Sequence, residues 1–196
     1  VLTENEEGLL DICHLVTNNG LAVYQSEPVC TPYTILELQI TADWGEGPSQ
    51  HVGEFVETRG VVTGTANAGF FLQDGEADWS GIYVYEYGHD LTVGDSAVVK
   101  GTIKEYYGLT EIDLESYTVL NSGNALPTAK EITTNQVNSE AFEGLLVKTS
   151  GTNTGAMTSK GEWPLDDGSG EVLVDDLMFE FTPTEGFDYE VTGPVY

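Results

Sequence analysis

Two acidic loops hold the side chains whose types and spacing are best suited to chemistry. Each loop alternates carboxylates with glycine, and together they contain Asp74, Glu76, Asp78, Asp166, Asp167 and Glu171. Carboxylate oxygens that alternate along such a loop are typical ligands of Ca²⁺. Neither loop has the twelve-residue EF-hand pattern, and Asp-Gly also favours ordinary turns. The sequence therefore supports two hypotheses for these loops, calcium binding or turn formation alone.

No set of side chains in the sequence predicts catalysis. The histidines His14, His51 and His89 are far apart in the sequence. None of them has a nucleophile or a carboxylate at the spacing of a catalytic triad or a metal site. We therefore expect a protein that is not an enzyme and that has no cofactor, apart from the Ca²⁺ considered above.

Both cysteines, Cys13 and Cys30, lie near the N-terminus. Their spacing is not that of a zinc motif. They form either a disulfide, as in secreted proteins, or two buried thiols, and we favour the disulfide. Closing this short loop would stabilise the protein by about 3 kcal/mol. The chain opens on an acidic stretch rather than a signal peptide, which fits a mature form released from its leader. We expect an extracellular or cell-surface location.

The charge balance limits the partners. Six Lys+Arg against 33 Asp+Glu give a net charge of −27. Affinity for nucleic acid comes mainly from cations that neutralise phosphates, so we expect no nucleic-acid partner. No apolar run is long enough to insert into a membrane. The acidity fits a salty or extracellular medium, or a cationic partner.

The same order of strand-like runs occurs twice. The first copy has runs at 55–63, 69–74, 81–85, 97–103 and 109–120, and the second at 145–149, 162–165, 172–181 and 187–195. Short β-branched and aromatic runs with turns between them predict small antiparallel barrels. Gly60 and Gly101 lie inside strands, where glycine usually marks a bulge or a sharp bend.

The first copy resembles a known family. The residues concerned are Gly60-Val61-Val62-Thr63, Gly69-Phe70-Phe71-Leu72-Gln73-Asp74-Gly75, Ser80-Gly81-Ile82-Tyr83-Val84-Tyr85, Val93-Gly94-Asp95, Gly101-Thr102-Ile103 and Glu105-Tyr106-Tyr107-Gly108-Leu109-Thr110-Glu111. They resemble an OB-fold domain of secreted bacterial proteins, which often precedes an endonuclease/exonuclease/phosphatase-type domain and also occurs in cell-surface proteins. The resemblance covers residues 50–120 well and 142–196 more weakly. It implies five-stranded Greek-key barrels but no catalytic site, because catalysis in those proteins belongs to another domain.

The resemblance also suggests a second function, that of a nucleic-acid-binding accessory module of a secreted nuclease. OB-folds that read single strands stack bases on exposed aromatic rings. Phe70, Tyr83 and Tyr85 are the candidates for an outward-facing aromatic set. Because no cations accompany these rings, we favour packing or subunit contact as their use.

We predict an all-β chain with two tandem OB-like barrels, the second without its last strand. The expected domains are an N-terminal extension (1–40), a first barrel (41–121), a linker (122–141) and a second, incomplete barrel (142–196). A short helix is expected at 34–38, and in the linker Thr134 is expected to cap another over 135–142.

The second copy ends at Tyr196 without a counterpart of the run at 109–120. Four strands would leave backbone groups unpaired along an open edge. The N-terminal extension holds apolar runs that could pair with this edge, and the residues expected to interact are Leu9, Leu10, Ile12, Leu15, Leu21, Val23, Tyr189, Val191 and Val195. The missing strand could come from a neighbouring subunit, from the same chain or from residues after Tyr196. Donation by a neighbour makes a homo-oligomer or a head-to-tail filament.

Overall fold

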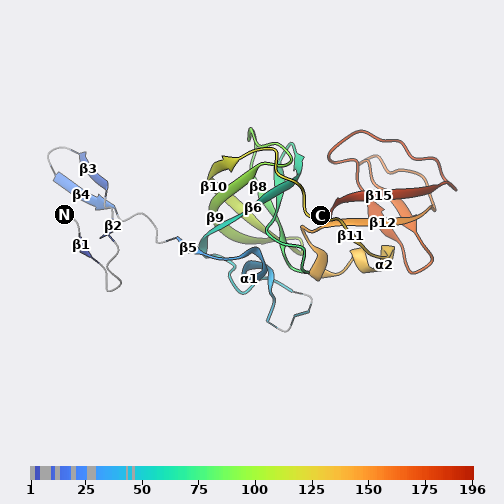
Figure 1. Cartoon of the computed structure of the whole chain (residues 1–196), viewed down its shortest axis with the longest axis horizontal. Coiled ribbons are helices and arrows are strands. Elements are labelled where there is room, and N and C mark those ends of the chain that lie inside the picture. The colour runs from blue at the N-terminus through green and yellow to red at the C-terminus, as the bar shows by residue number, and fades with distance from the viewer. Residues whose placement is uncertain are drawn as a thin grey trace. The chain divides into compact units, whose positions relative to one another are not determined.

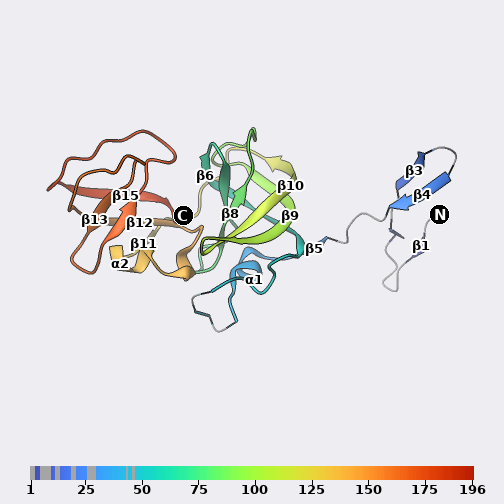
Figure 2. The same cartoon turned by 180° about the vertical axis from the view of Figure 1, so that it is seen from behind.

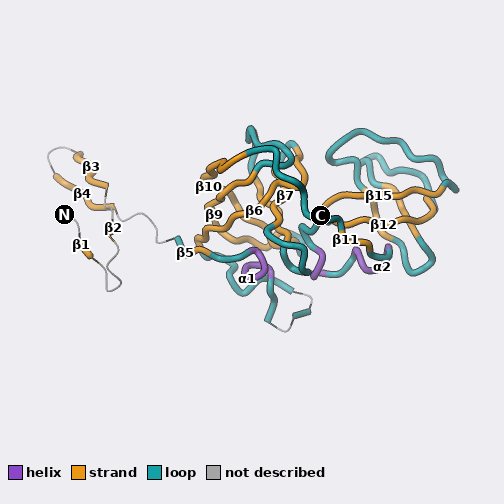
Figure 3. Tube along the Cα trace, in the orientation of Figure 1, coloured by secondary structure: helices purple, strands orange, loops and turns teal. Residues whose placement is uncertain are grey.

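The structure is a computed structural model that describes residues 30–42, 44–45 and 47–196, and before them only the strands at 3–4, 10–11, 14–18 and 21–25. The chain forms two compact units, Val1–Thr31 and Pro32–Tyr196. Strands dominate the described residues of both units (Figures 1, 2 and 3). The prediction of an all-β chain is confirmed at this level.

The N-terminal unit contains two antiparallel hairpins. Strand β1 (Thr3–Glu4) pairs with β2 (Leu10–Asp11), and β3 (His14–Asn18) pairs with β4 (Leu21–Gln25). Each hairpin is a separate two-stranded sheet. An isolated two-stranded hairpin is marginally stable at best in water.

Strand β5 (Thr31–Pro32) spans the boundary between the units, and helix α1 (Ile35–Gln39) and a sheet that closes on itself follow in the second unit. Its strands are β6 (Phe55–Ala66), β7 (Gly69–Gln73), β8 (Gly81–Tyr85), β9 (Ser96–Tyr106) and β10 (Leu109–Asn121). Strand β6 pairs with both β7 and β9, while β10 lies between β8 and β9. These five strands are called the closed sheet below.

The closed sheet surrounds one apolar core. Along β9 buried side chains alternate with partly exposed ones, as expected when one face of a strand packs inward. The core includes Ile35 and Leu38 of α1, a helix whose N-terminus is closed by a capping box of Thr34 and Glu37. The short helix expected at 34–38 is therefore present. Although placed in the N-terminal extension by the sequence, it packs into the closed sheet.

A second sheet follows in the second unit. Among the described residues it has no strand in the position that β10 has in the closed sheet. Its elements are β11 (Lys130–Glu131), helix α2 (Thr134–Val137), a 3₁₀ helix η1 (Glu140–Phe142), β12 (Leu146–Asn153), β13 (Trp163–Asp166), β14 (Val172–Val174) and β15 (Asp188–Pro194). Strand β12 pairs with β11, β13 and β15, and β14 pairs with β13. Strands β11–β15 are called the open sheet below. Figure 3 shows the long loop that joins β14 to β15.

The open sheet repeats the register of the closed sheet. Matching pairs are Leu72↔Ile82 with Leu165↔Val172, Val61↔Gln73 with Thr152↔Asp166, and Val56↔Gly101 with Val147↔Gly193. Strands β12, β13, β14 and β15 are therefore the counterparts of β6, β7, β8 and β9. No described strand is a counterpart of β10.

Two details of the open sheet differ from the sequence prediction. The linker helix is capped by Thr133 rather than Thr134, because the Thr133 side chain accepts from the N–H of Gln136 in a capping box. The run at 172–181, predicted as one strand, leaves the sheet after Val174. A turn follows, in which the Phe179 N–H donates to the carbonyl of Asp176 at 3.1 Å.

The two sheets pack closely against each other. The N–H of Leu146 donates to the Gln73 side chain at 2.9 Å, and the N–H of Trp79 donates to the Ala141 carbonyl at 2.8 Å. The backbone at Gly81 lies so close to Gly144 that a Cβ would not fit between them. The sheets therefore form a continuous interface inside the second unit.

Among the described residues, no helix has both the length and the apolar character needed to cross a membrane.

Candidate binding groove at the open edges

The site follows from the strand that the open sheet lacks. In the closed sheet, β10 pairs in parallel with β8 through Glu111–Asp113 and antiparallel with β9. The corresponding edges of β14 and β15 have no strand between them among the described residues. Their outer N–H and C=O groups can therefore pair with an added strand.

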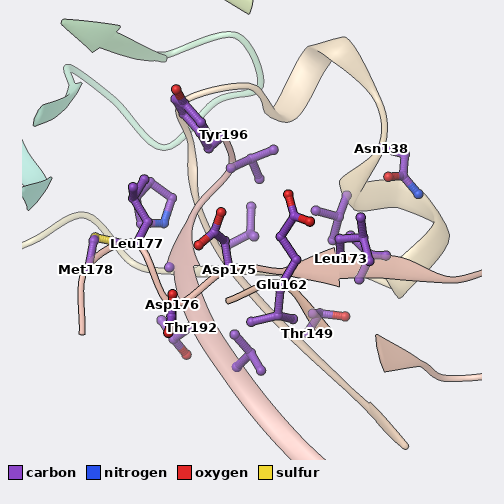
Figure 4. Close-up of a pocket in the computed structure, with 18 of the residues that line it drawn as sticks. Asn138, Thr149, Glu162, Leu173, Asp175, Asp176, Leu177, Met178, Thr192 and Tyr196 are labelled. Carbon is purple, nitrogen blue, oxygen red and sulfur yellow. The ribbon is translucent and has the colours of Figure 1, made fainter. Parts of the chain in front are cut away.

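A groove of about 790 Å³ lies at these edges. Its walls come from both sheets, including Phe71 and Leu109 of the closed sheet and Trp163, Val174 and Val191 of the open sheet. Figure 4 shows Leu173 on one side of the groove and Leu177 and Met178 on the other. The groove is thus a largely apolar space beside two strand edges that no other described strand pairs with.

Apolar side chains are more exposed at the groove than at the matching part of the closed sheet. Val84, Ile103 and Ile112, where β8, β9 and β10 meet, are completely buried. In the open sheet, Leu173 of β14 is 57% exposed and Phe179 of the following loop is 70% exposed. Further exposed apolar side chains of this loop are Leu177, Met178 and Phe181. Exposed apolar area of this kind is typical of interaction surfaces.

Aromatic rings form the floor of the groove. The ring centroids of Trp163 and Tyr189 are 5.2 Å apart, and those of Phe181 and Tyr189 are 5.7 Å apart. Edge-on contacts at these distances are favourable, so the loop between β14 and β15 is held against the sheet at Phe181. This packing keeps the loop beside the groove at that point.

Carboxylates lie among the apolar side chains of the groove. Figure 4 shows the acidic groups of Asp175 and Glu162 near the middle of the groove. Burial, followed by the charge of Asp176 and then that of Glu162, raises the pKa of Asp175, and a hydrogen bond from the N–H of Leu177 opposes this. An occupant that carries its own carboxylates would be repelled here.

The predicted interaction residues fall into three groups. Tyr189, Val191 and Val195 line the groove together. Leu10, Leu15, Leu21 and Val23 lie on strands β2, β3 and β4 of the N-terminal unit. Leu9 and Ile12 lie outside the described residues, as does Cys13, so the Cys13–Cys30 disulfide stays a prediction. The sequence reasoning missed Glu162, which carries no spacing signal that could have found it.

The acidic loops anchor the two short helices. Asp74 accepts the N–H of Ile35 at 2.9 Å, at the start of α1. Asp167 occupies the equivalent position at α2, where it accepts the N–H of Thr134 at 3.3 Å and its hydroxyl at 2.8 Å. Hydrogen bonds from Ser169 and Thr134 lower the pKa of Asp167 to about 2, whereas burial raises that of Asp74. A carboxylate beside a helix N-terminus satisfies donors that the helix leaves unpaired.

The other four loop carboxylates also accept hydrogen bonds or pair with a cation. Asp166 accepts from Gly168 and Gly170, Glu171 from Thr154 and Glu76 from Thr128, while Asp78 pairs with Lys130. In the described residues no group of three or more His, Cys, Asp or Glu side chains is placed to hold a metal ion. Turn and helix anchoring therefore accounts for these residues, and Ca²⁺ stays a prediction.

A buried carboxyl group lies where the two sheets meet. Glu143 accepts the N–H of Thr110 at 2.9 Å and the side-chain amide of Gln39 at 3.3 Å. Burial, and then the charge of Glu140, raises its pKa to about 8. Nothing in the sequence around Glu143 distinguishes it from the many surface acids, so its role could be found only from the tertiary structure.

The structure also places the aromatic side chains that were candidates for base stacking, and the histidines His51 and His89. Phe70 and Tyr83, expected in an outward-facing set, are instead buried, and only Tyr85 is exposed. The prediction was wrong for the first two because both faces of β7 and β8 are covered. His51 lies 2.9 Å from Glu54, and His89 contacts the carbonyls of Ala66 and Gly69.

No protein-family model matches this chain, and no curated protein matches it. The assignment of a function therefore depends on the site itself.

Proposed function

We propose that this protein is a non-catalytic extracellular or cell-surface module of two OB-like Greek-key barrels that assembles head to tail. In this proposal the groove between β14 and β15 accepts a β-strand from the N-terminal segment, and repeated donation produces a filament. The carrying observation is that the open sheet repeats the closed sheet in register, and that no strand in the described part of the chain occupies the position of β10.

Three features support strand addition over other uses of the groove. The two edges have the relative orientation that β10 satisfies in the closed sheet, one parallel and one antiparallel. The space beside them is lined by apolar side chains that a strand would cover. Strand addition supplies main-chain hydrogen bonds along both edges, and side-chain pockets give it specificity.

A substitution in the groove tests this function. Val191 is partly buried on β15 and faces the groove, whereas Val119 is exposed at the far end of β10. We expect wild-type particles to grow with protein concentration in sedimentation velocity, Val191→Glu to remain monomeric and Val119→Glu to behave as wild type. Leu173→Glu, at an exposed groove residue, repeats the test without disturbing the core. Undiminished assembly of a folded Val191→Glu or Leu173→Glu protein would refute the proposal.

The alternative of a nucleic-acid-binding accessory module has less support. Lys100, Lys104, Lys130 and Lys148 each form ion pairs with carboxylates of the protein itself. They are four of the six cations in the chain. Cations engaged in this way are poorly placed to neutralise phosphates.

A further inference from the structure

We propose that strand β4 (Leu21–Gln25) of a second copy of this chain fills the gap, running antiparallel to β15 and parallel to β14. In this arrangement Val23 takes the place that Ile112 has in the closed sheet. The inference rests on the proposed function and makes it specific, because it names the donor strand, its direction, its register and the molecule that supplies it.

The closed sheet supplies the template for the register. Ile112 of β10 is level with Val84 of β8 and with Ile103 of β9. The matched registers of the two sheets make Val174 and Val195 the counterparts of Val84 and Ile103. A donor residue at the position of Ile112 therefore lies between these two valines, and a β-branched apolar side chain such as that of Val23 suits it.

The length and composition of β4 fit the gap. Only Glu111–Asp113 of β10 pairs with β8, so a five-residue strand is long enough. Four of its residues, Leu21-Ala22-Val23-Tyr24, are consecutive and apolar. A strand that is apolar on both faces is typical of one buried on both sides. The groove meets this need, since the interior of the open sheet lies on one side and Phe71 and Leu109 on the other.

Charge also favours β3 and β4 over β1 and β2 as the donor. Asp175 and Glu162 project into the groove, so a donor without carboxylates is favoured. Residues 12–26 contain no Asp or Glu, although about one residue in six of the whole chain is acidic. Strands β1 and β2 carry Glu4 and Asp11 and are less suitable.

Strand β4 can be released from its hairpin. Its partner within the N-terminal unit is β3, in a sheet of two strands. Such a hairpin is marginally stable, whereas a strand in the gap forms hydrogen bonds along both edges. Exchange of partners therefore favours the docked strand.

The reach of the chain points to a second copy as the donor. Residues 26–31 connect β4 to the second unit, and six residues span at most about 22 Å. The second unit begins at β5, on the side of the closed sheet away from the open sheet (Figures 1 and 2). A domain of some 80 residues is about 30 Å across, so this connection is too short to bring β4 around it to the chain's own groove. Donation between copies is head to tail and continues without closing unless a ring forms.

Paired full-length variants test the donor. Val16 lies directly opposite Val23 in the β3–β4 hairpin, so Val16→Glu disturbs the hairpin as Val23→Glu does and is the matched control. We expect Val23→Glu to remain monomeric in sedimentation velocity and Val16→Glu to assemble as wild type. An equimolar mixture of Val23→Glu, with an intact groove, and Val191→Glu, with an intact β4, should stop at dimers.

Each other outcome overturns a defined part of the inference. Assembly of Val23→Glu with loss of assembly in Val16→Glu makes β3 the donor. Assembly of both variants, while Val191→Glu stays monomeric, leaves the groove function intact and removes β4 as donor. Donation between copies is excluded if the wild-type protein is monomeric. It is also excluded if Val23→Glu and Val191→Glu, each monomeric alone, form no dimer when they are mixed. If Val191→Glu lowers the melting temperature, Leu173→Glu takes its place in the mixture.

Discussion

At the scale of single residues, Glu143 couples the junction of the two sheets to pH. Its carboxyl is buried and its pKa is raised to about 8, so folding favours the protonated form. A raised pKa in the folded state gives stability that is complete below the unfolded value of 4.5 and is lost as the pH rises through about 8. Within this window the loss has a slope of at most about 1.4 kcal/mol per pH unit.

Glu143→Gln tests this coupling. The glutamine oxygen can accept the same hydrogen bonds from Thr110 and Gln39 without carrying a charge. We expect the variant to match wild type in stability near pH 4 and to exceed it increasingly toward pH 8, measured by urea unfolding at each pH. Subtracting the two curves removes the contribution of the other carboxylates. A difference independent of pH would contradict the assignment.

Asp74 and Asp167 allow the calcium and helix-anchoring hypotheses to be separated. If each carboxylate anchors a helix N-terminus, Asp74→Ala and Asp167→Ala each lower the melting temperature. For each variant the decrease is then the same in the presence of Ca²⁺ as in the presence of a chelator. For Asp74 the expected loss is about 1 kcal/mol, as for a helix N-cap. Calorimetry under both conditions measures it. A rise in wild-type melting temperature on adding Ca²⁺, abolished by either substitution, would establish a calcium site instead.

At the scale of elements, the contact between the sheets depends on a glycine. A side chain at Gly81 on β8 would collide with the backbone of Gly144, whereas at Gly75 the nearest atom to a new Cβ is 3.7 Å away. We expect Gly81→Ala to destabilise the second unit by about 1–3 kcal/mol, the cost of overpacking, and Gly75→Ala to have a small effect. Thermal unfolding of the two variants makes the comparison. Equal melting temperatures would show that the sheets separate without cost.

The hairpins of the two units also differ at this scale. Strand β10 is held on both edges and buried by the closed sheet, whereas β4 is held on one edge within the N-terminal unit. Among the described residues β10 therefore has two strand partners and β4 has one. This difference in partners supports the proposed donation of β4.

At the scale of the whole molecule, net charge determines which partners are excluded. With a net charge of −27, we expect a Kd for single-stranded DNA no tighter than about 1 mM at physiological salt, because six cations among 33 acidic residues displace few counterions from the DNA. Fluorescence titration with labelled oligonucleotides measures it. Micromolar binding would favour the accessory-module alternative over assembly.

The sequence by itself determined the β-rich character, the order of the strands and the repetition of that order in the second half of the chain. These features are local, because they depend on alternating apolar residues and on turn residues such as Asn-Gly and Asp-Gly. The sequence did not predict where β14 ends. Residues 172–181 have strand-like composition, but Val174 is the last of them that pairs with a neighbouring strand. A strand continues only where a partner edge is present.

Only the tertiary structure decided which side chains meet. Asp74 and Ile35, and Asp167 and Thr134, are brought together by the fold across 39 and 33 residues, so the helix-anchoring contacts of these carboxylates could not be read from the sequence. Glu143 became distinctive only when the packing of the two sheets removed water from it. The groove likewise is lined by residues of β14 and β15, two strands with separate positions in the sequence. Burial and proximity are properties of the folded chain, and residue type and spacing do not contain them.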